Sequence, residues 1–140
     1  PLVDSTGHLR LGDLDNKRDW GFAKEYVEAM WLMLQQDAPQ DYVIGTGTSH
    51  TVKNACQIAF AHVGLNWEDH VISNERLMRP TEIKELKGDY TKAKTELGWE
   101  PKTSFEDLIK DHGIKKVLNV LNRFMPGQWQ RRNNKICLKN

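Results

Sequence analysis

The sequence predicts an α/β fold, because short apolar runs typical of strands alternate with segments of helical periodicity. The clearest helix covers residues 22–36, where four apolar side chains recur at steps of four residues: Phe22, Tyr26, Met30 and Leu34. The clearest strand covers residues 41–46, a short run that contains Tyr, Val and Ile and leads into a turn. The same alternation continues beyond these two segments.

Further elements flank this helix and strand. Residues 8–11 are predicted to form a short strand that ends at Gly12, and residues 13–17 have the polar composition of a turn. Pro39 ends the first helix. Thr51 is the predicted N-cap of a second helix, and Gly64 suits the position after its end. One face of that helix is apolar and consists of Val52, Ala55, Cys56, Ala59, Phe60 and Val63.

The second half of the chain continues the pattern. Val71 and Ile72 indicate another strand, and residues 91–97 a short helix closed by Gly98. Ser104 and Asp107 resemble a capping box, which opens a helix through at least Lys110. We expect Met30, Trp31 and Met33 in the first helix to be core side chains, and Cys56 to be an inert core thiol.

The composition is that of a soluble globular protein. The chain has 140 residues, 39% of them hydrophobic and 28% charged, and its longest apolar run, 29–34, is far too short to span a membrane. The two cysteines are widely separated, which argues against a disulfide framework and fits a reducing, cytoplasmic compartment. The five histidines show no metal-ligand spacing.

The net charge of +1 conceals an asymmetry. Residues 112–140 contain seven of the 20 basic residues and no acidic residue, whereas residues 1–111 contain the other 13 and all 19 acidic residues. We therefore divide the chain into a body, 1–111, and a basic, divergent tail, 112–140. The tail allows nucleic-acid binding as an alternative function, but its Phe124 and Trp129 do not interleave with its basic residues as in a recognisable module, so we do not expect nucleic-acid binding.

Arg18 and Asp19 stand just before the first helix, followed by Trp20 and Gly21. A guanidinium suits phosphate oxygens because its planar fork makes paired hydrogen bonds, and Asp19 could orient that fork or cap the helix. The simpler interpretation is a surface ion pair worth under about 1 kcal/mol. Taken in isolation, the segment favours the simpler interpretation.

Arg79 and Glu82 form the second candidate. Pro80 favours an extended conformation at Arg79, so the guanidinium could meet a diphosphate while the Glu82 carboxylate accepts hydrogen bonds from sugar hydroxyls. An ordinary polar loop is again the simpler interpretation. Tyr90 and Lys94 match a Tyr-x-x-x-Lys pattern, which we interpret as accidental because such short motifs need structural context. No Gly-x-Gly-x-x-Gly, Walker A or zinc pattern is present in the sequence.

Several segments together resemble one family. These are LRLGDLDNKRDWGFAKEYVEAMWLMLQ, DYVIGTGTSHTV and RPTEIKELKGDYTKAKTELGWEPKTSFEDLI. They resemble the carboxy-terminal part of GDP-mannose 4,6-dehydratase, an extended short-chain dehydrogenase/reductase with a Rossmann-type fold. The resemblance covers residues 9–111, and it is specific because the Arg-Asp-Trp-Gly, Arg-Pro-Thr-Glu and Leu-Gly-Trp-x-Pro segments occur in family order.

The resemblance implies a substrate-binding role for this chain. In the family the amino-terminal domain holds NADP, and the carboxy-terminal domain holds the GDP-sugar. By analogy Arg18 and Arg79 would contact the GDP diphosphate and Glu82 the guanosine ribose, with Gly12 and Asp13 near the same pocket. Trp20 would then be a packing residue that fixes Arg18.

The family is an NADP-dependent lyase that converts GDP-mannose to GDP-4-dehydro-6-deoxy-mannose for GDP-fucose biosynthesis, and it forms homo-oligomers. Its glycine-rich loop and catalytic residues would lie upstream of Pro1, so we expect a fragment that binds GDP-mannose but is inactive alone. Asp13 stands where the family usually has Asn, and its carboxylate would repel a diphosphate. The alternatives are a fragment of another nucleotide-sugar epimerase or reductase, and a non-catalytic module that binds a partner or nucleic acid.

Overall fold

Two small sheets and four α-helices make up the ordered framework of the computed structural model, which describes residues 6–79 and 81–113. The strands are β1 (Leu9–Leu11), β2 (Lys17–Asp19), β3 (Ser49–Thr51) and β4 (Val71–Ser73). The α-helices are α1 (Ala23–Leu34), α2 (Val52–His62), α3 (Thr91–Leu97) and α4 (Phe105–Leu108). Three short helical turns complete the order: η1 (Trp67–Asp69), η2 (Glu75–Leu77) and η3 (Ile109–Gly113).

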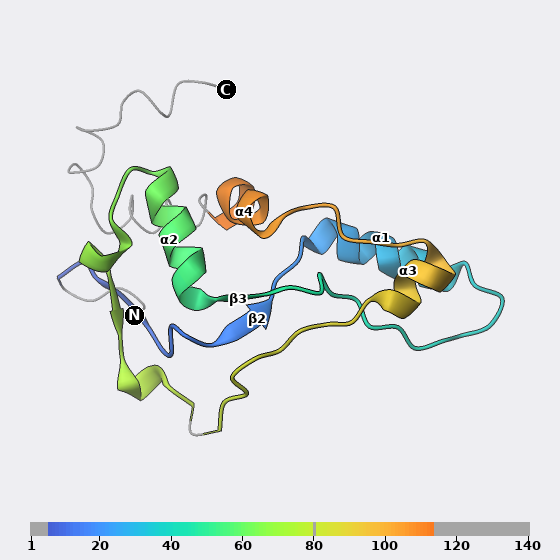
Figure 1. Ribbon diagram of the computed structural model, residues 1–140, viewed down its shortest axis with the longest axis horizontal. Helices are drawn as coiled ribbons and strands as arrows, with labels where there is room; N and C mark the ends of the chain where they lie inside the picture. Colours follow the sequence, from blue (N-terminus) through green and yellow to red (C-terminus); the bar gives the residue numbers. More distant parts are fainter. Residues whose placement is uncertain (1–5, 80, 114–140) are drawn as a thin grey trace.

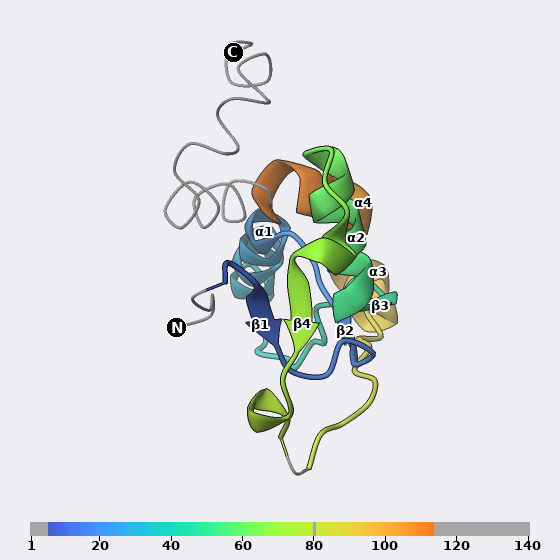
Figure 2. The same cartoon turned by 90° about the vertical axis from the view of Figure 1, so that its left-hand side faces the viewer.

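Both sheets join segments that are distant in sequence. β1 and β4 are parallel, with Arg10 opposite Ile72, and they lie side by side in Figure 2. β2 and β3 are antiparallel, with Arg18 opposite His50. A parallel pair needs a long crossover, and here α1, β3 and α2 lie between its two strands in the chain. The mixture of helices with parallel and antiparallel strands confirms the predicted α/β class.

Local chemistry sets the start of α2 and α4 and the end of α3. Thr51 accepts a hydrogen bond from the Asn54 N–H at 3.0 Å and so caps α2. Ser104 caps α4 in the same way, through the Asp107 N–H at 3.1 Å. Gly98 ends α3 with φ +66°, a left-handed conformation that glycine adopts without steric cost.

Two apolar clusters hold these elements together, one at each end of the view in Figure 1. The first packs α1 against α3 and consists of Ala29, Ala93, Leu97 and Trp99. The second packs α2 against β4 and consists of Cys56, Phe60 and Val71. Cys56 is 7% exposed, which confirms a core cysteine, and burial raises the pKa of its thiol to about 11, which favours an unreactive thiol.

The predicted strand at 41–46 is wrong, because this segment has no regular secondary structure and belongs to neither sheet. A strand needs a partner for its backbone N–H groups, whereas the N–H groups of Thr46 and Gly47 donate to the Asp19 carboxylate. The strand of this region is β3, a few residues later. Both β3 and β2 escaped prediction, because each has only three residues and a polar composition.

The expectation that Met30 and Trp31 are core residues is also wrong for the described residues. Their exposed fractions are 57% and 60%, and those of Val27 and Leu34 are 61% and 81%. Met33 packs partly buried against the first cluster. The helical periodicity correctly predicted an apolar face on α1, but the described part of the chain covers only its Ala29 side.

Within the described residues, no helix is long and apolar enough to cross a membrane. The predicted tail, 112–140, falls almost wholly outside the residues that the structure describes, so the boundary after Asp111 stays a prediction.

Candidate functional site

Strand β2 brings Arg18 beside the segment that contains Glu82. The Lys17 N–H donates to the Lys84 carbonyl at 2.8 Å, and the Leu86 N–H donates to the Lys17 carbonyl at 3.1 Å. Arg18 then donates from Nη1 to the Ile83 carbonyl at 2.9 Å and pairs through Nη2 with the Glu82 carboxylate. Side chains separated by 64 residues in sequence are thus paired.

Arg79 approaches the same carboxylate from its own loop. Its Nε lies 3.9 Å from Oε2 of Glu82, and its side chain is 80% exposed. Arg18 and Glu82, in contrast, are only 22% and 20% exposed. The two predicted arginines therefore meet at Glu82, with Arg18 anchored and Arg79 open to solvent.

A hollow of about 200 Å³, called here the small hollow, lies next to this cluster. Its lining residues are Asp13, Asn16, Leu77, Met78, Arg79, Glu82 and Lys84. Gly12 positions one wall, since a Cβ there would lie 2.8 Å from the Leu77 carbonyl oxygen. Only glycine therefore allows the turn at residues 12–13 to approach η2 so closely.

Asp13 does not stand in this hollow as an unpaired charge. Lys84 Nζ lies 2.8 Å from its Oδ2, and the Asp15 N–H donates to its Oδ1 at 2.9 Å. The hydrogen bond from Lys84 lowers the pKa of Asp13, and the same contact raises the pKa of Lys84. The repulsion that the sequence predicts between Asp13 and an anion is therefore offset by Lys84, a residue that sequence reasoning missed.

Asp19 neither orients Arg18 nor caps α1, so both interpretations offered for it were wrong. Its carboxylate accepts hydrogen bonds from the N–H groups of Thr46, Gly47 and Gly88, each 2.9–3.0 Å away, and from the Thr46 hydroxyl at 2.6 Å. Burial alone would raise the pKa of Asp19, but these hydrogen bonds lower it overall. The N-cap of α1 is Phe22, which makes no side-chain cap bond.

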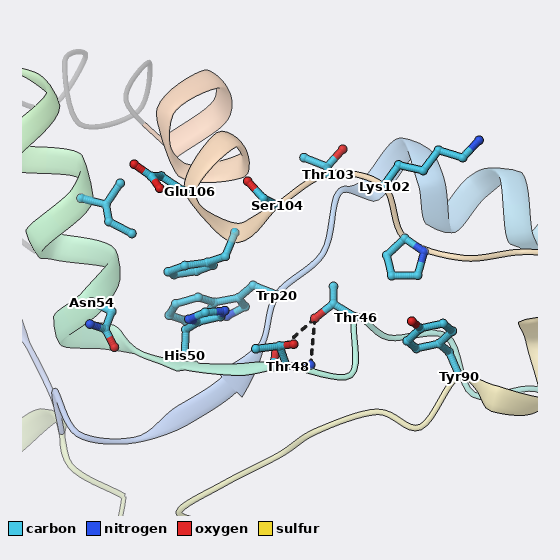
Figure 3. Close-up of a pocket in the computed structure, with 13 residues that line it drawn as sticks. Trp20, Thr46, Thr48, His50, Asn54, Tyr90, Lys102, Thr103, Ser104 and Glu106 are labelled. Atoms are coloured by element: carbon cyan, nitrogen blue, oxygen red, sulfur yellow. Dashed lines mark hydrogen bonds between the residues drawn. The ribbon is translucent and has the colours of Figure 1, made fainter.

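A larger hollow of about 620 Å³ lies between α2 and α4 (Figure 3). Phe105 stacks on Trp20, with ring centroids 5.4 Å apart, and on His50 at 3.9 Å. Trp20 is thus a packing residue, as expected, but its stacking partner is Phe105. Arg18, Arg79 and Glu82 do not line this hollow. The larger hollow has two charged lining side chains, Lys102 and Glu106, and Glu106 is paired with Lys110. The small hollow has more cations around it and is therefore the better candidate for binding an anion. No cluster of metal-ligating side chains occurs in the part that the structure describes.

A family model described as GDP-mannose 4,6 dehydratase matches residues 2–112. The chain belongs to the GDP-mannose 4,6-dehydratase family. It is 59% identical over 102 residues to GDP-mannose 4,6 dehydratase 1 of Arabidopsis thaliana, an alignment that covers 73% of this chain and 28% of the relative. It is 45% identical over 118 residues to the GDP-mannose 4,6 dehydratase of Homo sapiens, covering 72% and 32%. The chain thus spans about a third or less of the curated relatives it matches.

Solved structures show the same fold. The chain matches a UDP-glucose 4-epimerase from Thermotoga maritima, solved with UDP-glucose, with a TM-score of 0.65 and 28% identity over 79% of this chain and 36% of that one. It matches a dTDP-glucose 4,6-dehydratase from Bacillus anthracis, in complex with NAD, with a TM-score of 0.66 and 22% identity, covering 91% and 36%. These relatives confirm that this member of the GDP-mannose 4,6-dehydratase family forms part of a Rossmann-type extended short-chain dehydrogenase/reductase fold.

Solved structures similar to this chain contain a nicotinamide dinucleotide, but the turn Gly45-Thr46-Gly47 does not fit the pyrophosphate of such a cofactor. Pyrophosphate binding to a glycine-rich turn needs free backbone N–H groups. In the turn Gly45-Thr46-Gly47, the Thr46 and Gly47 N–H groups already donate to Asp19. This turn is therefore not a pyrophosphate site.

Proposed function

We propose that this chain supplies the GDP-sugar-binding surface of a GDP-mannose 4,6-dehydratase. Arg18 and Arg79 contact the diphosphate, Glu82 accepts hydrogen bonds from the guanosine ribose, and Gly12 and Asp13 border the same hollow. The observation that carries the proposal is the approach of both guanidinium groups to the Glu82 carboxylate beside the small hollow. Family membership supplies the substrate class.

The charges around the small hollow are suited to an anion. Arg18, Arg79 and Lys84 bring three cationic groups, against the carboxylates of Asp13 and Glu82. Guanidinium groups bind diphosphate oxygens through charge-assisted hydrogen bonds. The carboxylates are available to sugar hydroxyls, which are hydrogen-bond donors.

The two arginines have different roles in this proposal. Arg18 uses three N–H donors on Lys17, Ile83 and Glu82, so two of the five guanidinium donors remain for a phosphate. Among the described residues, Arg79 makes a single long contact, to Glu82, and its exposed side chain can turn toward a ligand. We infer that Arg18 presents a fixed donor edge and that Arg79 closes on the diphosphate from the solvent side.

The complete enzyme of this family uses NADP to dehydrate GDP-mannose to GDP-4-dehydro-6-deoxy-mannose. In our proposal this chain binds the GDP-sugar and does not convert it, and assembly with further copies belongs to the complete enzyme. An assay of the 140-residue chain with GDP-mannose and NADP should give no 4-dehydro product above background.

Calorimetric titration of the full chain with GDP tests the binding role. Arg79→Ala should weaken GDP affinity about tenfold, since it removes a charge-assisted hydrogen bond. Arg76→Ala is the matched control, because Arg76 is an exposed arginine on η2 that does not line the small hollow. Equal effects of the two substitutions, or no GDP binding by the unmodified chain, would refute the proposal. A titration with UDP tests the alternative that the chain serves another nucleotide-sugar enzyme.

A further inference from the structure

Asn16 places a buried side-chain oxygen without a hydrogen-bond partner in the wall of the small hollow. Asn16 is 7% exposed, and its Oδ1 accepts no hydrogen bond from the residues that the structure describes. Burying an amide oxygen without a donor disfavours folding, because the oxygen gives up its hydrogen bonds to water. A polar group kept in this state next to a binding hollow suggests that a ligand satisfies it.

The backbone around Asn16 is fixed, so a local shift does not readily relieve the amide. Its carbonyl accepts a hydrogen bond from the Val52 N–H at 3.3 Å, and the Leu14 carbonyl accepts one from the Lys53 N–H at 2.9 Å. The next residue, Lys17, is paired with the 84–86 segment. The turn at 13–16 is therefore held between the N-terminus of α2 and the loop that carries Glu82.

The chemistry of the neighbouring groups indicates what Asn16 binds. Arg79 and Lys84 supply the positive charge of the small hollow, so a phosphate has stronger partners than a neutral amide. An amide presents an acceptor at one end and a donor at the other, and the two ends exchange by a simple rotation. A hydroxyl pairs with either end, whereas a phosphate pairs only with the donor.

We propose that Asn16 is a further substrate-binding residue, whose side-chain amide hydrogen-bonds a sugar hydroxyl of the nucleotide ligand. This inference rests on the proposed function, and it adds a neutral contact to the charged set of Arg18, Arg79 and Glu82. The hydroxyl belongs either to the ribose or to the hexose of a nucleoside diphosphate sugar. In both cases Asn16 contacts the sugar part of the ligand, and the cationic side chains contact the diphosphate.

The test compares three probes on the full chain: inorganic pyrophosphate, GDP and GDP-mannose. Asn16→Ala should bind GDP or GDP-mannose about three- to tenfold more weakly, the loss of one hydrogen bond, and should bind pyrophosphate as the unmodified chain does. A loss with both nucleotides assigns the ribose, and a loss confined to GDP-mannose assigns the hexose. Asn16→Leu, which keeps the number and branching of the side-chain heavy atoms, should give the same affinities as Asn16→Ala.

Stability provides a second readout. Replacing a buried amide whose oxygen is unpaired by leucine should leave the urea midpoint unchanged or raise it, so weaker binding by Asn16→Leu cannot be attributed to unfolding. Asn66→Ala is the opposite control: it removes the cap of η1 and should lower stability. Because Asn66 does not line the small hollow, this substitution should leave nucleotide affinity unchanged.

Three results would overturn the inference. Unchanged nucleotide affinity in both Asn16 variants would show an unpaired amide with no ligand role. An equal loss with pyrophosphate would place Asn16 at the phosphate end. Failure of the unmodified chain to bind GDP or GDP-mannose would overturn the proposed function itself, and the inference with it, whereas the first two results leave the proposed function intact.

Discussion

The carboxylate of Asp19 accepts a hydrogen bond from the backbone N–H of Gly88 at 3.0 Å, across 69 residues of sequence. The same carboxylate holds the N–H groups of Thr46 and Gly47. Gly45 and Gly88 allow this close approach, because a Cβ on Gly45 would lie 2.9 Å from Oδ2 of Asp19 and 3.0 Å from the Gly88 Cα. Asp19 thus joins β2, the turn before β3 and the loop that leads back to the small hollow.

Asp19→Ala should lower the free energy of unfolding by about 2–3 kcal/mol, because it leaves several backbone N–H groups without their charged acceptor. Urea denaturation followed by tryptophan fluorescence measures this loss. Asp41→Ala serves as the control, because the Asp41 carboxylate is exposed. This substitution should change the free energy of unfolding by less than about 0.5 kcal/mol. A loss of similar size in both variants would contradict the special role of Asp19.

Arg18 and Arg79 should separate stability from binding. Arg18→Ala removes hydrogen bonds to two backbone carbonyls and an ion pair with Glu82, so we expect a loss of about 1–2 kcal/mol in unfolding free energy. Arg79→Ala should cost less than about 0.5 kcal/mol, because the side chain is largely exposed. Thermal or urea unfolding of both variants without ligand measures this difference in unfolding free energy. Equal stabilities would show that the contacts of Arg18 contribute nothing to the fold.

The exposed apolar face of α1 should make the isolated chain self-associate. Val27, Met30, Trp31 and Leu34 are each more than half exposed, which is unusual for a monomeric protein. Trp31→Lys combined with Leu34→Lys should shift the chain toward monomer in sedimentation velocity. Gln36→Lys adds a lysine just past the end of the helix, outside this face, and should leave the distribution unchanged. A chain that is already monomeric at all concentrations would contradict this prediction.

Cys56 should make stability fall at alkaline pH. Burial raises the pKa of its thiol from 9.0 to about 11, so the folded state keeps a proton that the unfolded state releases. The contribution is fully present below pH 9 and is lost as the pH rises toward 11, by about 1 kcal/mol at pH 10.5 after allowance for partial solvent access. Urea unfolding at pH 8 and pH 10.5 measures the decline. Cys56→Ala should decline less, since the other titrating groups are common to both proteins; an identical decline would exclude this role.

The sequence by itself determined the features that depend on neighbouring residues. Helices α1, α2, α3 and α4 were predictable because apolar periodicity, the Thr51 and Ser104 caps and the glycine stops all act within a turn or two of the chain. The strands β1 and β4 were found from short apolar runs. The family was also predictable from the sequence, because its characteristic segments keep their order and their residues.

Tertiary structure alone decided which charges meet. Nothing local in sequence states that Arg18 pairs with Glu82, that Lys84 neutralises Asp13, or that Asp19 serves a turn 27 residues away. Strands β2 and β3 are polar and three residues long, so they exist through pairing with distant backbone and not through propensity. The unpaired Oδ1 of Asn16 became visible only when its neighbours were placed, since burial and hydrogen-bond satisfaction are properties of the folded chain.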